Sequence, residues 1–403
     1  MRAQIGLDEL GIDPGVAGFF TRPDYADVLA RLRAEAPVLA YTPGSWTVAR
    51  YDDVRAVSRD PETFCSGQGV LMLDPVRDGA TLPGSILHMD PPVHAEWRKV
   101  ASRWFTPRAV AQLSERVHAR TVEVLDRVEP GSEVDFVDAV AAPIPVLVIA
   151  ELLGVGDADE QDFRRWSDAC IEGAEDDTDH EAEGLEKMAA VGELMAFLGE
   201  HVSARRAEPG DDLLSLLVTA EVEGRALTDD EVVMYCLSIL VAGNETTRHL
   251  LSGAAAALYE HPDQRALLRR DADAMDGAVE ECLRWVTPIQ LFCRTATTDA
   301  RIGDVDIPAG DRVVLLYASA NRDEAAFGDD ADRFDVTRPP NPAHLAFGFG
   351  EHLCLGASLA RLEGRIVLRQ LLDRFGAYEV TGEPTWGRST LVRGMASLPV
   401  LLG

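Results

Sequence analysis

The sequence contains cysteine but lacks the spacing that would pair it. Its six cysteines are scattered over 403 residues without a C-x-x-C motif, at Cys65, Cys170, Cys236, Cys282, Cys293 and Cys354. Disulfide frameworks, zinc sites and iron–sulfur clusters use closer or repeated spacings, so the pattern argues against all three. A reducing compartment is the simplest interpretation.

Long apolar runs and flexible linkers are also missing. The first residues, MRAQIGLDELGIDPG, contain no apolar stretch long enough for a signal peptide or a membrane anchor. A prior of ~150 residues per domain would give two or three domains. Because no Ser/Gly-rich, Pro-rich or repeated segment divides the chain, we instead predict one domain over residues 1–403.

Positive charge is scarce: 38 Lys and Arg residues face 68 Asp and Glu residues, which gives a net charge of −30. This balance disfavours nucleic acid and anionic membrane surfaces as partners. Two basic segments run against it, residues 97–108 and the arginines Arg361, Arg365 and Arg369. They predict a docking face for an acidic partner, and ordinary solvated helix faces are the open alternative.

The residue patterns predict a mainly helical α+β fold. A helix is expected over residues 25–35, followed by a strand pair at 38–41 and 46–49. Helical patterns dominate from about residue 52 to 285, with an acidic loop at 172–183. Strand patterns return at 295–317 and 378–402, so helices and small sheets are segregated.

One glycine-bounded cysteine stands out near the C-terminus, in the segment Phe347–Gly356 with the sequence FGFGEHLCLG. Gly350 and Gly356 allow a close backbone approach and a positive φ. Phe347 offers an apolar face that keeps water from the sulfur of Cys354. Such a loop suits the presentation of one thiolate to a large, flat metal cofactor, and an inert buried cysteine in a turn is the alternative.

The segment matches the pattern F-x-x-G-x-x-x-C-x-G and resembles the haem-binding loop of the cytochrome P450 family. The resemblance implies the cytochrome P450 fold, which is helix-rich with small separate sheets. It also implies that Cys354 is the axial ligand of the iron in haem b (Fe-protoporphyrin IX), with O₂ as co-substrate. The lack of an anchor then suggests a soluble, cytoplasmic, bacterial member.

A long helix is predicted from the capping box at residues 228–231 to Glu260, and polar residues interrupt its middle. The hexapeptide Ala242–Thr247 reads AGNETT, and glycine inside a helix costs ~1 kcal/mol relative to alanine. It is similar to the family motif A/G-G-x-D/E-T. The resemblance implies that Ala242 and Gly243 border the haem at a local distortion of the helix. Thr246 and Glu245 would then deliver protons, and a distortion facing solvent is the alternative.

Glu281 and Arg284 have the i, i+3 spacing of a helical ion pair. An exposed pair of this kind is common and contributes only ~0.3–0.5 kcal/mol. Its place between the long helix and the cysteine loop resembles the family's E-x-x-R element. The resemblance implies a buried structural network that orders the cysteine loop, with Arg338 as third partner.

Four cationic or imidazole side chains occupy positions where the family binds the two haem propionates. His94 and Arg98 lie in Asp90–Arg98, which resembles the D-P-P-x-H-x-x-x-R element. Arg294 follows the E-x-x-R helix, and His352 lies two residues before the cysteine. Taken singly, each residue is more often a surface cation than a ligand.

The function implied by the resemblance is a haem-thiolate monooxygenase that inserts one atom of O₂ into an apolar small molecule. A sterol, terpenoid or fatty acid is the expected substrate. The expected pocket residues are Leu87, Val241, Ile289, Leu291, Phe292 and Leu391.

Two alternatives stay open at this stage. One is a tailoring oxidase acting on a free or carrier-bound polyketide or peptide, and the other is a non-catalytic haem-binding sensor or carrier. For the favoured function, no flavin or iron–sulfur segment is recognised in the chain. Electrons are therefore expected from a separate ferredoxin and an NAD(P)H-dependent ferredoxin reductase, with the chain itself a monomer.

Overall fold

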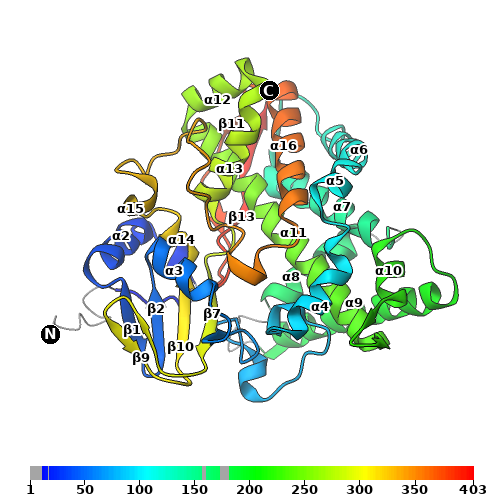
Figure 1. Cartoon of the computed structure of the whole chain (residues 1–403). Coiled ribbons are helices and arrows are strands. Elements are labelled where there is room, and N and C mark those ends of the chain that lie inside the picture. Colours follow the sequence, from blue (N-terminus) through cyan, green and yellow to red (C-terminus); the bar gives the residue numbers. More distant parts are fainter. Residues whose placement is uncertain (1–10, 17, 157–159, 173–180) are drawn as a thin grey trace.

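The computed structural model describes residues 11–16, 18–156, 160–172 and 181–403. A helix-rich part, built around the central helix α11, lies beside a smaller part that contains the main sheet (Figure 1). Most of the acidic segment 172–183, predicted to be a loop, lies outside the described residues. Within the described part, no helix has the length and apolarity needed to cross a membrane.

Helices form most of the structure, as the residue pattern predicts. The α-helices are α2 (Tyr25–Glu35), α3 (Tyr51–Ser58), α4 (Val93–Ser102), α5 (Pro107–Ala111), α6 (Ser114–Leu125), α7 (Pro143–Leu153), α8 (Glu160–Glu172), α9 (Glu181–Ala207), α10 (Leu213–Thr219), α11 (Asp229–Glu260), α12 (Pro262–Arg270), α13 (Met275–Val286), α14 (Tyr317–Ala320), α15 (Glu324–Phe327) and α16 (Ala357–Arg374). Shorter 3₁₀ or π turns are η1 (Phe19–Thr21), η2 (Pro75–Asp78), η3 (Ile86–His88), η4 (Val137–Ala141), η5 (Ala272–Ala274) and η6 (Gly350–His352).

The strands are short and fall into separate sheets. They are β1 (Val38–Thr42), β2 (Ser45–Val48), β3 (Phe64–Cys65), β4 (Ser132–Asp135), β5 (Glu221–Val222), β6 (Arg225–Ala226), β7 (Leu291–Ala296), β8 (Ala300–Ile302), β9 (Val305–Ile307), β10 (Arg312–Leu316), β11 (Glu379–Val380), β12 (Thr385–Trp386), β13 (Met395–Ser397) and β14 (Pro399–Leu402). The largest sheet has the order β1-β2-β10-β7-β3, with β2 and β10 parallel.

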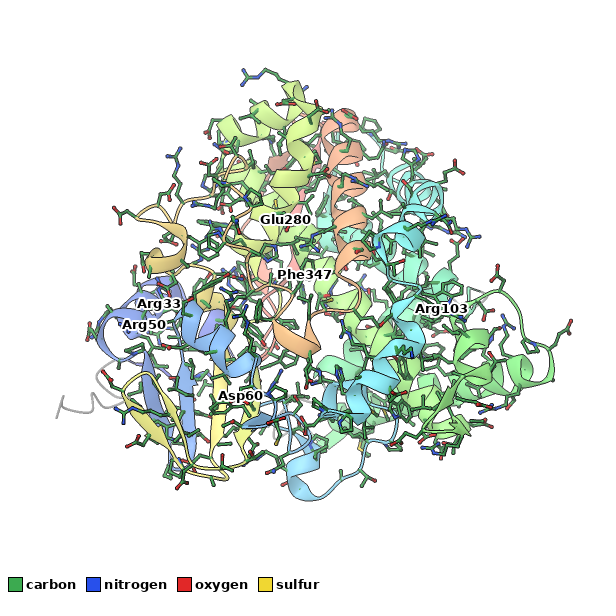
Figure 2. All side chains as sticks on the ribbon, viewed as in Figure 1. Arg33, Arg50, Asp60, Arg103, Glu280 and Phe347 are labelled. Carbon is green, nitrogen blue, oxygen red and sulfur yellow. The ribbon has the colours of Figure 1, made fainter. Side chains whose placement is uncertain are left out.

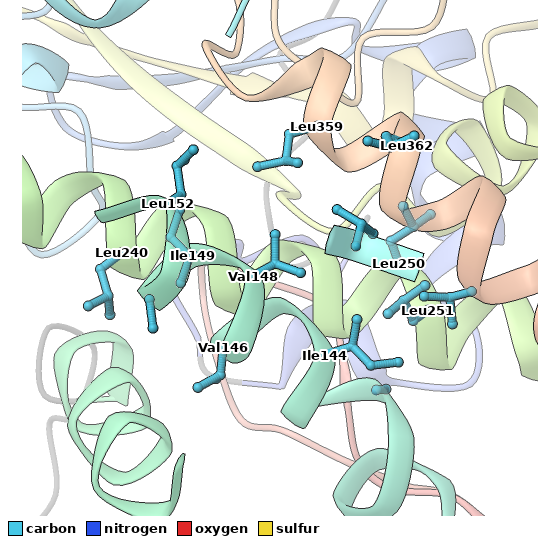
Figure 3. Close-up of a cluster of buried hydrophobic side chains, with 14 of the residues drawn as sticks. Ile144, Val146, Val148, Ile149, Leu152, Leu240, Leu250, Leu251, Leu359 and Leu362 are labelled. Carbon is cyan, nitrogen blue, oxygen red and sulfur yellow. The ribbon is translucent and has the colours of Figure 1, made fainter. Parts of the chain in front are cut away.

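Helix α11 begins at the predicted capping box, in which the side chains of Thr228 and Glu231 each bond the other's backbone N–H. Its apolar faces pack against α7 and α16, as the side chains of Ile144, Leu250 and Leu362 illustrate (Figure 3). The predicted distortion is absent, since the chain is α-helical throughout Asp229–Glu260. The hydroxyl of Thr246 donates to the carbonyl of Ala242 at 2.7 Å without breaking the helix, because a carbonyl oxygen can accept two hydrogen bonds.

The cysteine loop is anchored against α3. Gly350 has φ +78°, and a Cβ at this position would collide with the carbonyl oxygen of Ser58. Glycine is therefore required there by both conformation and space. The expected positive φ of Gly356 is wrong: this residue has φ −82° and serves as the N-cap of α16. The helix that starts at Ala357 sets its backbone angles.

Glu281 and Arg284 form a buried, bidentate pair on α13, with both side chains almost fully enclosed. Arg284 Nε lies 2.7 Å from Glu281 Oε2, and Arg284 Nη2 lies 2.8 Å from Oε1. The remaining donors of Arg284 bond backbone carbonyls, including that of Asn321 at 2.8 Å. Arg338 Nε approaches Glu281 Oε2 at 3.3 Å, so the expected third partner is in place.

This network reaches the cysteine loop through Asn321. The side-chain oxygen of Asn321 accepts the backbone N–H of Leu345 at 2.6 Å, two residues before Phe347. The guanidinium of Arg284 thus bonds backbone carbonyls of the chain that leads to the loop, and the side-chain amide of Asn321 bonds the start of the loop. The i, i+3 pair of Glu281 and Arg284 would contribute little on a surface. Because it is buried here, it holds the chain that leads to Cys354.

Glu281→Gln should lower the free energy of unfolding by about 3–5 kcal/mol, since it leaves the buried guanidinium of Arg284 without its carboxylate. Urea denaturation of the haem-containing protein measures this change. The matched control is Asp306→Asn, which breaks an ion pair to Arg301 whose side chains are 83% and 59% exposed. That control should cost under about 1 kcal/mol, and equal effects of the two variants would contradict the assignment.

Glu363 on α16 is a buried carboxyl whose Oε2 has no hydrogen-bond partner within the described structure. Burial raises the pKa of this carboxyl to about 8. The folded protein therefore holds a proton that the unfolded chain, with an ordinary carboxyl pKa, releases. Stability should consequently fall as pH rises between these two pKa values.

Glu363→Gln removes this pH-dependent penalty without changing the side-chain shape. We expect the variant and the unchanged protein to have similar stability at or below pH 4.5, where the free carboxyl is at least half protonated. At pH 8 the variant should be more stable, by on the order of 4 kcal/mol. Unfolding free energies measured from pH 5 to 8 test this, and a pH-independent difference would show that the carboxyl is ionised in the folded protein.

Candidate functional site

A cavity of about 490 Å³ lies between α11, the cysteine loop and the segment that precedes α4. Its walls come from distant parts of the sequence, among them α4, β7, α16 and residues 390–392. Aliphatic and aromatic side chains dominate the lining, and a few cationic and hydroxyl groups interrupt it. A second, more open hollow of about 560 Å³ beside α16 contains none of the predicted site residues.

Cys354 lines this cavity, so its accessible surface faces an internal space enclosed by protein. Its backbone N–H donates to the carbonyl of Phe347 at 2.8 Å, which closes the loop around the sulfur. Burial raises the pKa of the Cys354 thiol, while the N–H of Gly356 and the charge of Arg98 act in the opposite direction. A thiol in this setting keeps its proton until a metal ion replaces it.

Phe347 lines the same cavity as Cys354. Its ring carries the guanidinium of Arg361, which lies 4.6 Å from the ring centroid. Arg361 is held in turn by Glu280 on α13, with Nε 2.6 Å from Oε1. Figure 2 shows Phe347 and Glu280 in this central region of the molecule. The stacked pair places an aromatic ring and a cation beside the loop that carries the sulfur.

His94 and His352 meet at the cavity wall, with ring centroids 4.1 Å apart. The Nε2 atoms of both rings are buried and have no hydrogen-bond partner within the described chain. Burial lowers the pKa of His94 to about 4 and that of His352 to about 2, and nearby arginines add to both shifts. The Nε2 atoms of the two imidazoles therefore await an acceptor or donor in the cavity.

Arg98 and Arg294 border the same wall. Each uses one terminal nitrogen on a backbone carbonyl, Arg98 on Leu353 at 2.5 Å and Arg294 on Cys293 at 2.7 Å. Their remaining N–H groups are suited to carboxylate oxygens. The four predicted propionate residues are thus brought together in one place, and they fit a planar cofactor with two carboxylates.

These residues could also suggest a metal site, because ligand atoms of His94, His352 and Glu351 lie within 4.8 Å of one another. The charge environment argues against it. The arginines that lower the histidine pKa values would repel a cation, whereas they attract an anion. A propionate therefore matches the cluster better than a metal ion does.

Residues of α11 form a further wall. Ala242 and Gly243 line the cavity, as does Thr246. A Cβ on Gly243 would lie 3.3 Å from Cδ1 of Ile149, so close packing against α7 also favours glycine here. The hydroxyl of Thr246 consequently reaches the cavity from a rigid helix that makes close contact with its neighbour.

Glu245 faces a different way from Thr246 and is absent from the cavity lining within the described residues. Its carboxylate is buried beside Arg248 at 2.5 Å and His249 at 3.3 Å. Burial alone would raise the pKa of Glu245, but the bond to His249 and the charge of Arg248 outweigh it and hold the pKa low. The acid and the alcohol are sequence neighbours whose side chains occupy different environments.

A second carboxylate, Asp168 on α8, joins this cluster. Arg248 Nη1 lies 2.7 Å from Asp168 Oδ1, so one guanidinium bridges two acids. Burial and the charge of Glu245 raise the pKa of Asp168 to about 7, although Arg248 opposes the shift. The sequence did show Glu245, Arg248 and His249 at i, i+3 and i+4 spacing. It contained no sign that Asp168, on another helix, would meet them.

Five of the six predicted pocket residues line the cavity, namely Leu87, Val241, Ile289, Phe292 and Leu391. Leu291 does not, and this prediction is wrong. Successive residues of a strand point to opposite faces, so when Phe292 faces the cavity, Leu291 faces away. Its side chain is fully buried in a separate core with Leu39 and Val314. Residues that the sequence reasoning missed include His88 and Glu363.

Comparison with known proteins agrees with this geometry. A family model described as "Cytochrome P450" matches residues 183–386. An erythromycin C-12 hydroxylase of Saccharopolyspora erythraea is 39% identical over 96% of this chain and 97% of its own length. A steroid C26-monooxygenase of Mycolicibacterium smegmatis is 38% identical over 94% of this chain and 96% of its own length.

Solved structures show the same similarity. A Mycobacterium marinum cytochrome P450, CYP268A2, in complex with pseudoionone superposes with a TM-score of 0.86 at 36% identity, covering 95% of this chain and 96% of the other. The family holds haem b and uses O₂ as co-substrate, and the cavity residues fit that cofactor. The chain therefore belongs to the cytochrome P450 family and is an oxygen-incorporating oxidoreductase.

Proposed function

We propose that this monooxygenase inserts one oxygen atom from O₂ into an apolar small molecule of the sterol, terpenoid or fatty acid classes. The observation that carries the proposal is that the Cys354 thiol and the Thr246 hydroxyl line one largely aliphatic cavity. When bound, the haem would supply O₂ activation and oxygen transfer. Cys354 would bind its iron, and His94, Arg98, Arg294 and His352 would hold its propionates. The whole chain would act as one domain.

Thr246 would hold a proton at Oγ1, inside a cavity whose apolar walls exclude most water. Its donation to Ala242 fixes the hydroxyl on the rigid helix while leaving the oxygen accessible. Glu245 would restore the proton to this region through its cluster with Arg248 and Asp168, which reaches the partly exposed side of α8. Controlled proton delivery of this kind limits wasteful release of reduced oxygen.

The lining supports an apolar substrate, since Leu87, Val241, Ile289, Phe292 and Leu391 offer no hydrogen bonds. The steroid-oxidising relative supports the same class. A tailoring oxidase of polyketide or peptide biosynthesis is the second candidate, and the erythromycin hydroxylase relative favours it. The non-catalytic sensor or carrier is set aside, because the named relatives are monooxygenases and hydroxylases.

Electrons would come from a separate ferredoxin and reductase, and we place the docking face at the end of α4 and in α5. Lys99, Arg103 and Arg108 are exposed, and each is free of ion pairs within the described structure. Arg103 lies just beyond the last residue of α4 (Figure 2). Their unneutralised charge suits a small acidic partner.

The arginines of α16, also expected to attract this partner, contribute less. Arg361 pairs with Glu280 and Arg365 pairs with Asp276 at 3.1 Å. Arg369 pairs with Asp373 on the same helix. Their charge is therefore largely neutralised within the chain. Glu280 and Asp276 lie far from these arginines in the sequence, so the sequence alone did not show this neutralisation.

We further propose that the enzyme is a cytoplasmic monomer.

Thr246→Ala should reduce the amount of product formed per NAD(P)H consumed by about tenfold, since a positioned proton donor contributes typically ~10²-fold or more and water replaces it in part. Product and hydrogen peroxide are quantified in the reconstituted system with any oxidised substrate. The control is Ser238→Ala, whose hydroxyl also lines the cavity and donates to its own helix, to Met234 at 2.8 Å. Unchanged coupling in Thr246→Ala would remove the proton-delivery role.

Arg103→Glu should slow reduction by ferredoxin by about tenfold at low ionic strength, with the difference shrinking as salt is added. Stopped-flow absorbance of the haem follows this step. Arg270→Glu makes the same charge change at the end of α12, away from α4 (Figure 1), and should have little effect. Equal slowing by the two variants would show that net charge matters and that no docking face lies at α4.

A further inference from the structure

The segment 66–92, which leads into α4, contains a buried polar chain formed by Asp74, His88 and Ser85. Nε2 of His88 lies 3.1 Å from Oδ2 of Asp74. Nδ1 of His88 lies 2.9 Å from Oγ of Ser85. The side chain of Asp74 has no exposure and that of His88 is 9% exposed. Ser85 and His88 both line the cavity that Cys354 also borders.

Asp74 makes this segment rigid. Its Oδ2 accepts the backbone N–H groups of Val70 at 2.6 Å and Leu71 at 2.9 Å. Its Oδ1 accepts the N–H of Val76 at 3.0 Å. Burial opposes ionisation, but these bonds and the bond to His88 outweigh it, so the pKa of Asp74 is strongly lowered. The carboxylate is thus a fixed acceptor, independent of whether Ser85 is present.

The direction of the hydrogen bonds follows from this. An ionised carboxylate only accepts, so Nε2 of His88 carries the hydrogen that faces Asp74. In the neutral ring, Nδ1 is then an acceptor, and the hydroxyl of Ser85 donates to it. The oxygen of Ser85 consequently keeps its lone pairs for a donor in the cavity.

The surroundings make this oxygen unusual. Apart from His88, the other residues of the segment that line the cavity are all apolar: Leu71, Met72, Leu73, Leu82, Ile86 and Leu87. The other hydroxyls described above, those of Ser238 and Thr246, donate to carbonyls of their own helix. A buried acceptor at the wall of an apolar space is costly unless something bonds it. The bonds of Asp74 to the backbone already hold the segment. The bond between His88 and Ser85 is therefore not needed for the fold, which suggests that it serves a ligand in the cavity.

We propose that Ser85, positioned by His88 and Asp74, is a specificity residue that accepts a hydrogen bond from one hydroxyl group of an otherwise apolar substrate. The inference rests on the proposed function, which makes this cavity the substrate site, and narrows the substrate class to apolar alcohols such as sterols or terpenoid alcohols. One fixed contact at the wall would select which carbon of the skeleton is presented for oxidation.

The test compares two matched pairs of probes, farnesol with farnesene and perillyl alcohol with limonene. Dissociation constants are measured on the haem-containing protein by the change in haem absorbance and by equilibrium dialysis. For at least one pair the alcohol should bind about tenfold more tightly, which is the gain expected of one buried hydrogen bond. Ser85→Ala should abolish this preference at unchanged haem content, and Ser85→Thr, which keeps a hydroxyl, should restore most of it.

Leu82→Ala is the control in the same segment. It removes apolar contact, so it should weaken the alcohol and the hydrocarbon equally. His88→Phe should reduce the alcohol preference, because the hydroxyl of Ser85 then loses the partner that orients it.

Three results would overturn the inference: no preference for either alcohol in the unchanged protein, a preference retained in Ser85→Ala, or loss of haem in Ser85→Ala. The last would assign Ser85 to the cofactor or to the fold. Dialysis requires no turnover. A protein that binds the alcohol through Ser85 but forms no O₂-dependent product would therefore contradict the proposed function without contradicting the role of Ser85 in binding.

Discussion

The position of one thiol is the constraint on which the rest of the structure depends. Cys354 lies on a loop that is fixed at several points: Gly350 fits against the backbone of α3, the Cys354 N–H bonds Phe347, and α16 starts immediately after Gly356. The Glu281–Arg284 network holds the chain that leads into this loop. None of these contacts takes part in chemistry, yet each limits where the sulfur can be.

A second constraint is charge inside an acidic protein. With a net charge of −30, the chain nevertheless places Arg98, Arg294 and two histidines with unbonded Nε2 atoms along one cavity wall. Such a cluster is unfavourable alone, and an anionic group with two carboxylates would relieve it. The haem-thiolate assignment therefore explains the sulfur and the cations together, whereas an inert cysteine explains neither.

The sequence predicted the parts of this site that depend on local spacing. The cysteine loop, the E-x-x-R pair and the capping box each lie within about ten residues of sequence, and the structure contains all three, although the φ of Gly356 differs from the expectation. The missed features join distant segments: Asp168 meets Glu245 across two helices, and the partners of the α16 arginines lie mainly on another element. Leu291 was assigned to the pocket because neighbouring residues were treated alike, although a strand alternates its faces. The contacts among Ser85, His88 and Asp74 depend on how residues 66–92 fold around the Asp74 carboxylate, and the spacing of these residues in the sequence does not show them.

The most direct test of the central claim is the absorbance spectrum of the dithionite-reduced, haem-containing protein with carbon monoxide. Thiolate ligation by Cys354 predicts a Soret band near ~450 nm in fresh, folded protein, and Cys354→Ala should lose that band. A band near ~420 nm in the unchanged protein would mean a neutral thiol or a histidine ligand and would contradict the account.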